Sequence, residues 1–386
     1  MGISDAIAAR LKRITRGIDT IISKYARLYT AFVSIVALLG YALVLLFPIL
    51  VITAAINIYQ ILLIYEAIDW KTAAIWSVVL VLSALFSYRS LQIKATPPVG
   101  LTLAKDKVPD IFRLTQHFQS HFKRPTIHRV VITPNYEVDI VKVPKWALPV
   151  WSTNALIIGL PVLLCLSPKQ FECLLASRIG QFSKRHNLIT NWLYQLRAIW
   201  KQYAIAYGKL KYPDSYLLKW FYAAYASFYN SVSVHTARRD KLYADSYAME
   251  LFTHEDVREM ITAEMTYQLY LQKRFWPVIN KMASAETKTP LTPYRNIASS
   301  IHTNVEDKKL TSLMHVALKS EPARKSPMPS LKQRLKNIGH DTPYMTEITE
   351  EAAANKYLGT SVNNVIKLID MLWAKDNKSR QKPAKE

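Results

Sequence analysis

The sequence predicts a mainly α-helical protein of the α+β class, in which an N-terminal transmembrane hairpin precedes a helical domain with a small β element. Apolar residues run almost without a break over 30–66 and again over 72–88, and roughly 20 such residues span the hydrocarbon core of a bilayer. Farther along, apolar side chains recur mostly at helical spacing, and the clearest strand-like alternation lies within 128–142.

The composition favours a membrane partner over a nucleic acid. Half of the 386 residues are hydrophobic, and the formal net charge is +22. A strongly basic chain can contact nucleic acid or anionic lipid. The sequence has no nucleic-acid motif and its basic residues are spread along the chain, so we expect membrane lipid and no nucleic acid as partner. Cys165 and Cys173 lie close together in an apolar stretch, which predicts buried thiols rather than a disulfide framework.

Residues 1–28 predict a basic amphipathic helix. Isoleucine and leucine recur at steps of three and four residues, with arginine and lysine between them. Such a helix could lie on anionic lipid. It could equally face a partner helix, and the sequence does not separate the two interpretations.

The transmembrane region, 29–92, is expected to cross the membrane twice. The first apolar run is longer than one span needs, and Pro48 could either kink one long tilted helix or divide the run into two short spans. Two spans in total place both flanking basic regions on the same side, as the positive-inside rule favours. We therefore expect an integral protein of a bacterial inner membrane with the large domain in the cytoplasm. Three spans would place that domain outside.

The clearest signal for the start of a helix lies within 158–186. Ser167 as N-cap, Pro168 at the first helical position and Gln170 at the third form a capping-box pattern. The residues that follow place a set of apolar side chains on one face of the helix, which predicts that this face is core: Phe171, Leu174, Leu175, Ile179 and Phe182.

The segment 175–181 of that helix reads Leu-Ala-Ser-Arg-Ile-Gly-Gln. It resembles the zinc-binding helix of the membrane metallopeptidases typified by HtpX and the CAAX prenyl endopeptidase, where the pattern is L-A-H-E-x-G-H. The leucine, alanine and glycine are kept. The resemblance places Ser177 and Gln181 at the two histidine ligand positions, and Arg178 at the position of the general-base glutamate.

Two later segments extend the resemblance. Residues 241–245, Lys-Leu-Tyr-Ala-Asp, are similar to the family's E-x-x-A-D. This places Lys241 at the third ligand position and Asp245 at the position of an aspartate that orients a metal-bound histidine. Residues 326–335 resemble T-H-P-x-x-x-x-R-L, with Met328 at the histidine position.

The resemblance covers 95–374 and implies a zincin-like metallopeptidase domain, followed by a basic tail, 375–386, that we expect to be disordered. The family also has a strand edge beside its cleft with the pattern N-A. Asn135 and Tyr136 would stand there, and a peptide could pair with that edge through its backbone.

The substituted positions predict a lost activity. Zinc prefers imidazole, thiolate and carboxylate ligands, and an arginine that keeps its proton cannot act as a base. We therefore expect no zinc and no other cofactor. We also expect Arg178, Lys241 and Asp245 to form a charge cluster in place of the metal.

Three functions follow as hypotheses. The first is a membrane-anchored pseudoprotease that binds peptides or membrane-protein segments, or regulates an active protease. The second is an active zinc metalloendopeptidase in membrane protein quality control, with replacement ligands such as His186, His235 and Asp240. The third is a membrane scaffold. The pair His117 and His121 is expected to lie on an ordinary helix face rather than to hold a metal. The sequence does not predict the oligomeric state.

Tyrosine and tryptophan are frequent over 188–232. They could form an aromatic belt at the membrane surface, where one end of each ring system is wet. They could instead be the packing between the helices of the domain.

Overall fold

The computed structural model describes eleven ranges of the chain: 24–64, 69–92, 99–123, 126–144, 152–183, 188–209, 216–284, 291–304, 307–322, 326–345 and 351–381. The amphipathic helix expected over 1–28 therefore lies outside the described residues up to residue 23. Two compact units are present, the first made from the described parts of 1–97, 142–153 and 192–237, and the second from the rest.

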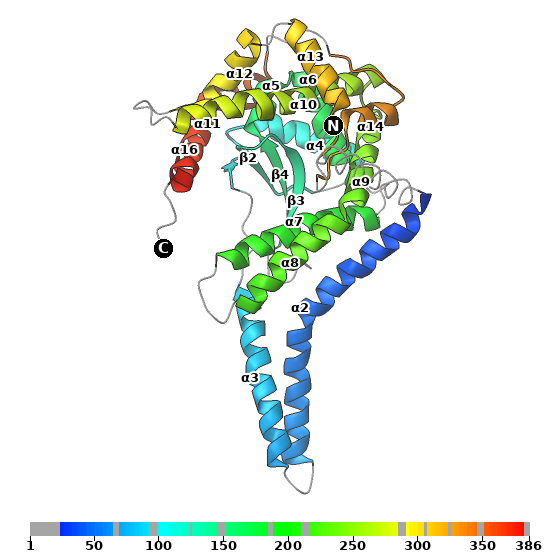
Figure 1. The fold of residues 1–386 in the computed structure, drawn as a ribbon, viewed down its shortest axis with the longest axis vertical. Coiled ribbons are helices and arrows are strands. Elements are labelled where there is room, and N and C mark those ends of the chain that lie inside the picture. The colour runs from blue at the N-terminus through cyan, green and yellow to red at the C-terminus, as the bar shows by residue number, and fades with distance from the viewer. Residues whose placement is uncertain are drawn as a thin grey trace, which may run out of the picture. The chain divides into compact units, whose positions relative to one another are not determined.

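The first unit begins with an apolar hairpin. Its arms are α2 (Ala26–Leu63) and α3 (Trp70–Gln92), and α3 lies beside the C-terminal part of α2 (Figure 1). Helix α2 continues through Pro48, so the first apolar run is one long helix rather than two short ones. Among the described residues, Val44–Leu63 and Trp70–Tyr88 are long and apolar enough to cross a membrane. The structure thus has one helix of sufficient length for each of the two membrane spans expected from the sequence.

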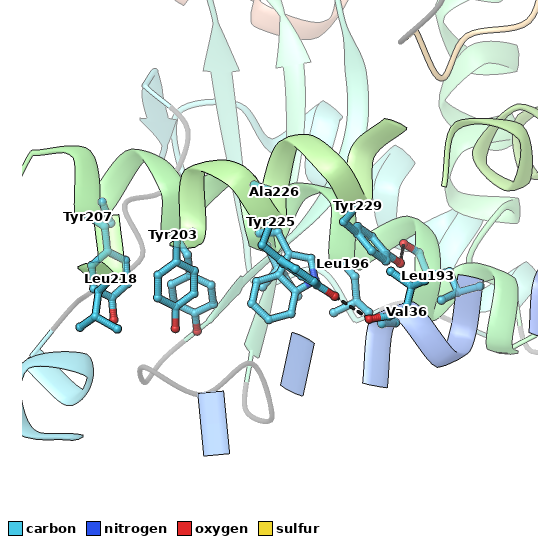
Figure 2. Close-up of a cluster of buried hydrophobic side chains, with 14 of the residues drawn as sticks. Val36, Leu193, Leu196, Tyr203, Tyr207, Leu218, Tyr225, Ala226 and Tyr229 are labelled. Atoms are coloured by element: carbon cyan, nitrogen blue, oxygen red, sulfur yellow. Dashed lines mark hydrogen bonds between the residues drawn. The ribbon is translucent and has the colours of Figure 1, made fainter. Parts of the chain in front are cut away.

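The rest of the first unit packs on the N-terminal part of α2. Helices α7 (Leu188–Gly208) and α8 (Tyr216–Val232) contribute most of a buried set that we call the aromatic cluster. Its fully or almost fully buried members are Val33, Val36, Ala37, Leu193, Leu196, Ile199, Trp200, Tyr203, Ala206, Tyr207, Leu218, Tyr222, Tyr225, Ala226 and Tyr229 (Figure 2). These contacts divide the expected 95–374 domain, because 192–237 belongs with the apolar hairpin.

Buried tyrosines in the aromatic cluster find backbone partners for their hydroxyl groups. Tyr225 donates to the carbonyl of Val36 at 2.7 Å, and Tyr229 donates to the carbonyl of Leu193 at 2.9 Å (Figure 2). A buried hydroxyl without a partner would be costly, so these bonds fix where α8 lies against α2 and α7. The interpretation of 188–232 as helix packing is correct for these residues.

Gly40 is where α2 and the aromatic cluster come closest. A Cβ at Gly40 would lie 2.2 Å from the hydroxyl oxygen of Tyr225, and a Cβ at Gly208 would meet nothing within 4 Å. We predict that Gly40→Ala lowers the free energy of unfolding by about 1–3 kcal/mol, because the Tyr225 ring must move and lose its hydrogen bond. Gly208→Ala should leave stability unchanged or raise it by up to about 1 kcal/mol. Urea titration of both variants in detergent micelles tests this, and equal stabilities would contradict it.

Most of the small sheet belongs to the second unit, although residues 142–144 and 152–153 of its strands belong to the first. Its strands are β1 (Leu101–Leu103), β2 (Arg129–Thr133), β3 (Val138–Pro144) and β4 (Ser152–Gly159), in the order β1-β2-β4-β3. Strand β1 runs antiparallel to β2 and β4 runs parallel to it, with Val130 opposite Leu156. The strand structure expected within 128–142 is confirmed by β2 and β3. Strand β4 was not predicted, because its apolar part, 155–158, is a short run without alternation that follows polar residues.

The helix expected after Ser167 is confirmed in detail. Helix α6 (Pro168–Gly180) follows the short α5 (Leu160–Cys165). The Ser167 Oγ accepts the Gln170 N–H at 3.2 Å, and the Gln170 Oε1 accepts the Ser167 N–H at 3.1 Å. This reciprocal pair satisfies two of the N–H groups that a helix start leaves without partners. Every expected apolar residue of α6 is buried, and Cys165 and Cys173 are buried free thiols, as predicted.

Helices surround α6 in the second unit. Helix α6 contacts α4, α10 and α15, and α10 also contacts α13 and α14. The bounds of the remaining helical elements are α4 Pro109–Phe122, α9 Val234–Ala248, α10 His254–Tyr270, the π-helix η2 Leu271–Phe275, α11 Trp276–Ser284, α12 Pro293–Asn304, α13 Asp307–Lys319, α14 Leu331–Asn337, α15 Ala353–Leu358, the 3-10 helix η3 Gly359–Ser361 and α16 Val362–Gln381.

The structure differs from the expected C-terminal tail over 375–381. The segment 375–386 was expected to be disordered, yet α16 continues to Gln381. Apolar residues recur at helical spacing up to Trp373, and the basic residues after it are compatible with further helical turns and favourable near the C-terminal end of the dipole. Residues 382–386 lie outside the described part of the chain.

Candidate functional site

Helices α6 and α9 bring the expected site positions together. The Ser177 hydroxyl donates to Asp245 Oδ1 at 3.4 Å, and the Gln181 side-chain amide donates to Asp240 Oδ2. Ser177 and Gln181 are four residues apart, so they present their side chains on the same face, and both are fully buried. The positions that the resemblance assigned to two zinc ligands therefore face α9, with Asp245 beside the first of them.

Close approach of the two helices depends on the glycine of the same pattern. A Cβ on Gly180 would lie 2.5 Å from the Cβ of Tyr247 on α9. A larger side chain at that position would push the helices apart. The glycine that the sequence shares with the metallopeptidase pattern thus has a packing role in this chain.

Arg178 makes an ion pair inside the protein. Its Nη2 lies 2.8 Å from Glu264 Oε1 on α10, and the arginine side chain is 1% exposed. Its Nε and Nη1 are buried and have no hydrogen-bond partner among the described residues. Arg178 therefore occupies the interior as a fixed cation, with its counter-charge supplied by a residue outside the sequence patterns.

A second arginine joins two of the carboxylates. Arg334 on α14 donates to both oxygens of Asp245, at 2.8 and 2.7 Å, and to Glu264 Oε2 at 2.6 Å. Its side chain is 0% exposed, as is that of Asp245. Bonds between ionised groups are stronger than neutral ones, and the planar guanidinium suits two acceptors at once. Arg334 is thus the cation that holds Asp245 and Glu264 together.

Lys241 completes the arrangement. Its Nζ lies 3.4 Å from Asp139 Oδ2 on β3. Burial, followed by the nearby charge of Arg178, lowers the pKa of Lys241 to about 8, while Asp139, Glu264 and Asp240 act in the opposite direction. Lys241 is therefore still mainly protonated at pH 7, inside the protein.

The charges of the arrangement lower the pKa of Glu264 as well. Burial alone would raise it, but Arg334, Arg178 and Lys241 together lower it to about 2. Glu264 is therefore ionised at neutral and mildly acidic pH.

We call this set the buried ion network; it consists of Asp139, Arg178, Lys241, Asp245, Glu264 and Arg334. It contains three cations and three carboxylates, so its charges balance when all are ionised. The residues at the positions that the resemblance assigns to the metal site do not fit zinc, because serine and glutamine are weak ligands and Lys241 and Arg178 are cations. Within the described residues, no group of three or more His, Cys, Asp or Glu side chains is placed to hold a metal ion.

The expected charge cluster forms, but with different pairs. Arg178, Lys241 and Asp245 were expected to cluster, and the ionic partner of Asp245 is Arg334. Arg178 pairs with Glu264. Glu264 was missed although it falls on the apolar stripe of α10 with Val257, Met260 and Ile261 at helical spacing. A lone carboxylate on a core-facing stripe was the signal that could have identified it.

The two residues expected to form a peptide-binding strand edge, Asn135 and Tyr136, do not lie in a strand. Asn135 and Tyr136 lie in the bend before β3, and β3, which is last in the strand order, begins at Val138. Asn135 is exposed, whereas the Tyr136 hydroxyl is buried without a hydrogen-bond partner among the described residues. The bend passes close to Gly159, whose N–H donates to the carbonyl of Glu137 at 2.6 Å. These two residues therefore belong to a bend and not to a strand edge.

Strand β3 also carries side-chain caps on its backbone. The Lys142 N–H donates to Gln195 Oε1 at 3.1 Å, and the Lys142 carbonyl accepts from Gln202 Nε2 at 3.2 Å. Such caps occupy the groups with which an added strand would pair. A peptide could not pair with Lys142 unless both glutamines moved.

The remaining candidates have ordinary surroundings. Met328 is half-buried before α14, where its N–H donates to Ser326 Oγ at 3.2 Å. On α4, His121 Nε2 lies 3.5 Å from Glu250 Oε2. Of the replacement ligands considered, His235 packs its ring edge-on against Tyr29, Asp240 bonds to Gln181, and His186 lies outside the described residues.

Comparisons with protein-family models, with curated proteins and with solved structures found no match to this chain.

Proposed function

We propose that this chain is a membrane-anchored, non-catalytic relative of the zinc metalloendopeptidases that acts by binding. Its partner would be an unfolded peptide or a membrane-protein segment, or an active protease that it regulates. The observation that carries this proposal is the buried ion network, in which cations stand at the general-base position and at the third ligand position of the family pattern. The apolar hairpin supports an anchor, with the second unit expected on the cytoplasmic side of a bacterial inner membrane.

The argument against catalysis is electrostatic. A hydrolytic zinc site needs a ligand set that accommodates a dication and a base that takes a proton from bound water. Arg178 and Lys241 repel a dication, and arginine keeps its proton. Neutralising that pair of cations already engages Glu264 and Asp139, so these carboxylates have a stabilising role that competes with any metal.

A scaffold without a peptide site is the second candidate. The observation that favours it is the pair of glutamines that caps Lys142 on β3, because the caps close part of the strand to backbone pairing. In that case the chain would organise other membrane proteins through its outer surface.

One assay separates these functions. Purified full chain in liposomes is mixed with fluorescently labelled unfolded casein and zinc, and both anisotropy and cleavage are followed. We expect anisotropy to rise without any cleavage, since the chain binds but cannot hydrolyse. No change in either signal would favour the scaffold. Cleavage that a chelator abolishes would contradict the proposal.

A further inference from the structure

Helix α8 has two faces with different environments. One face holds Tyr222, Tyr225 and Tyr229 in the aromatic cluster (Figure 2). The other face is solvent-exposed in the structure although it is apolar: Trp220 is 70% exposed, Tyr216 is 66% exposed and Phe228 is 52% exposed. A run of large exposed apolar side chains on one helix face indicates a surface that something covers.

The composition of the outer face favours a lipid partner. Its exposed positions are Tyr216, Leu217, Trp220, Ala223, Ala224, Ser227, Phe228 and Ser231, none of which is charged. Tyrosine and tryptophan are the residues enriched at the boundary between lipid and water. The one charged residue of α8, Lys219, lies beside this face with its Nζ 5.9 Å from the centre of the Tyr216 ring, where it could reach anionic headgroups.

The depth of α8 agrees with that partner. Tyr225 bonds to Val36 and lies against Gly40, whereas the candidate span of α2 begins at Val44. At about 1.5 Å per residue, the crossing lies about 6–12 Å from the start of the span along α2. The headgroup region on each side of the hydrocarbon core is roughly 5–8 Å thick. The side of the crossing nearest Gly40 therefore falls within the headgroup layer.

We propose that α8 lies in the plane of the membrane interface, with Tyr216, Leu217, Trp220 and Phe228 inserted among the lipids. The unit that contains the apolar hairpin would then have a third membrane-bound element that does not cross the bilayer. This inference rests on the membrane anchoring proposed above. It assigns a function to the exposed aromatic residues, which the packing of the aromatic cluster leaves unexplained.

The test uses nitroxide labels on the full chain in liposomes of phosphatidylcholine and phosphatidylglycerol. Single cysteines are introduced by Ala224→Cys on the outer face of α8, by Ile52→Cys in the candidate span and by Lys332→Cys on α14, all at exposed positions. Cys165 and Cys173 are buried, and the unsubstituted chain gives their background labelling. Relaxation by oxygen, which concentrates in lipid, is compared with relaxation by a water-soluble nickel chelate.

We expect the ratio of oxygen to nickel accessibility at residue 224 to shift from the value at residue 332 towards that at residue 52. A ratio at 224 equal to that at 332, with 52 in lipid, would overturn the inference but leave the anchor intact. A label at 224 that neither reagent reaches would also overturn it, because protein would then cover the face. A water-exposed label at residue 52 would overturn both the anchor and the inference.

Discussion

Replacing Arg334 with alanine should destabilise the second unit by about 3–5 kcal/mol, the largest effect that we expect from any single change. The substitution removes the guanidinium that donates to both oxygens of Asp245 and to Glu264. Asp245 is 0% exposed, so it would be left as a buried charge without its cation. Removing one partner of a buried pair is far more damaging than the net contribution of the pair, because desolvation of the remaining charge is no longer offset.

Urea titration in detergent micelles, followed by circular dichroism, measures this effect. The matched control is Arg113→Ala, since Arg113 also pairs with an aspartate at 2.7 Å but is 74% exposed. Exposed ion pairs contribute only up to about 1 kcal/mol. If the two variants lost similar stability, the buried ion network would have no special role in holding the unit together.

Replacing Glu264 with glutamine should have the next largest effect, and that effect should depend on pH. The folded-state pKa of Glu264 is lowered to about 2 from 4.5. A lowered acid pKa means that the stabilisation is fully present above the unfolded value, near pH 4.5, and is lost as the pH falls from there towards 2. The difference between the two pKa values corresponds to about 3 kcal/mol at pH 7.

The stability of Glu264→Gln relative to the unsubstituted chain should therefore be lowest at neutral pH, with the difference shrinking below about pH 4.5. Thermal unfolding of both the variant and the unsubstituted chain at pH 7, 4 and 3 measures that difference in stability. Glu255→Gln is the control, because Glu255 pairs with an arginine but is 58% exposed. A stability difference for Glu264→Gln that is constant over this pH range would show that its carboxylate charge is not the stabilising feature.

Local sequence patterns predicted the elements with strong boundary signals. The start of α6 follows from Ser167, Pro168 and Gln170, and the structure places a capping box there. Continuous apolar runs predicted two long apolar helices, and both are present. The resemblance to the zinc-binding pattern placed 175–181 and 241–245 at one site. These segments do meet in the structure, where Ser177 on α6 bonds to Asp245 on α9.

Long-range pairing was much less predictable. Glu264 and Arg334 lie 70 residues apart in sequence and carry no shared spacing, so their bond could not be read from either segment. The apolar part of β4 is the short run 155–158, for which periodicity does not separate a buried strand from a helix. Asn135 was expected on a strand edge but lies in a bend. The pairing of a strand depends on its neighbouring strands, and local alternation does not identify these neighbours.

Under the relationship proposed above, the buried ion network would explain how the helices could stay packed after metal ligands were replaced. A metal site concentrates positive charge among carboxylates and polar groups. Arg178 and Lys241 supply positive charge at the corresponding positions, and Arg334 bridges Asp245 to Glu264. Such a network can hold α6, α9, α10 and α14 together without a metal, provided that each buried charge keeps its partner.

Zinc binding tests the central claim most directly. The full chain and a variant that combines Ser177→His, Arg178→Glu, Gln181→His and Lys241→Glu are dialysed against zinc and then buffer, and bound zinc is measured by elemental analysis. Circular dichroism confirms that both are folded. The proposed relationship predicts no retained zinc in the unsubstituted chain and close to one zinc ion per chain in the variant, because the variant restores imidazole and carboxylate ligands on α6 and α9. Stoichiometric zinc in the unsubstituted chain, or none in a folded variant, would contradict it.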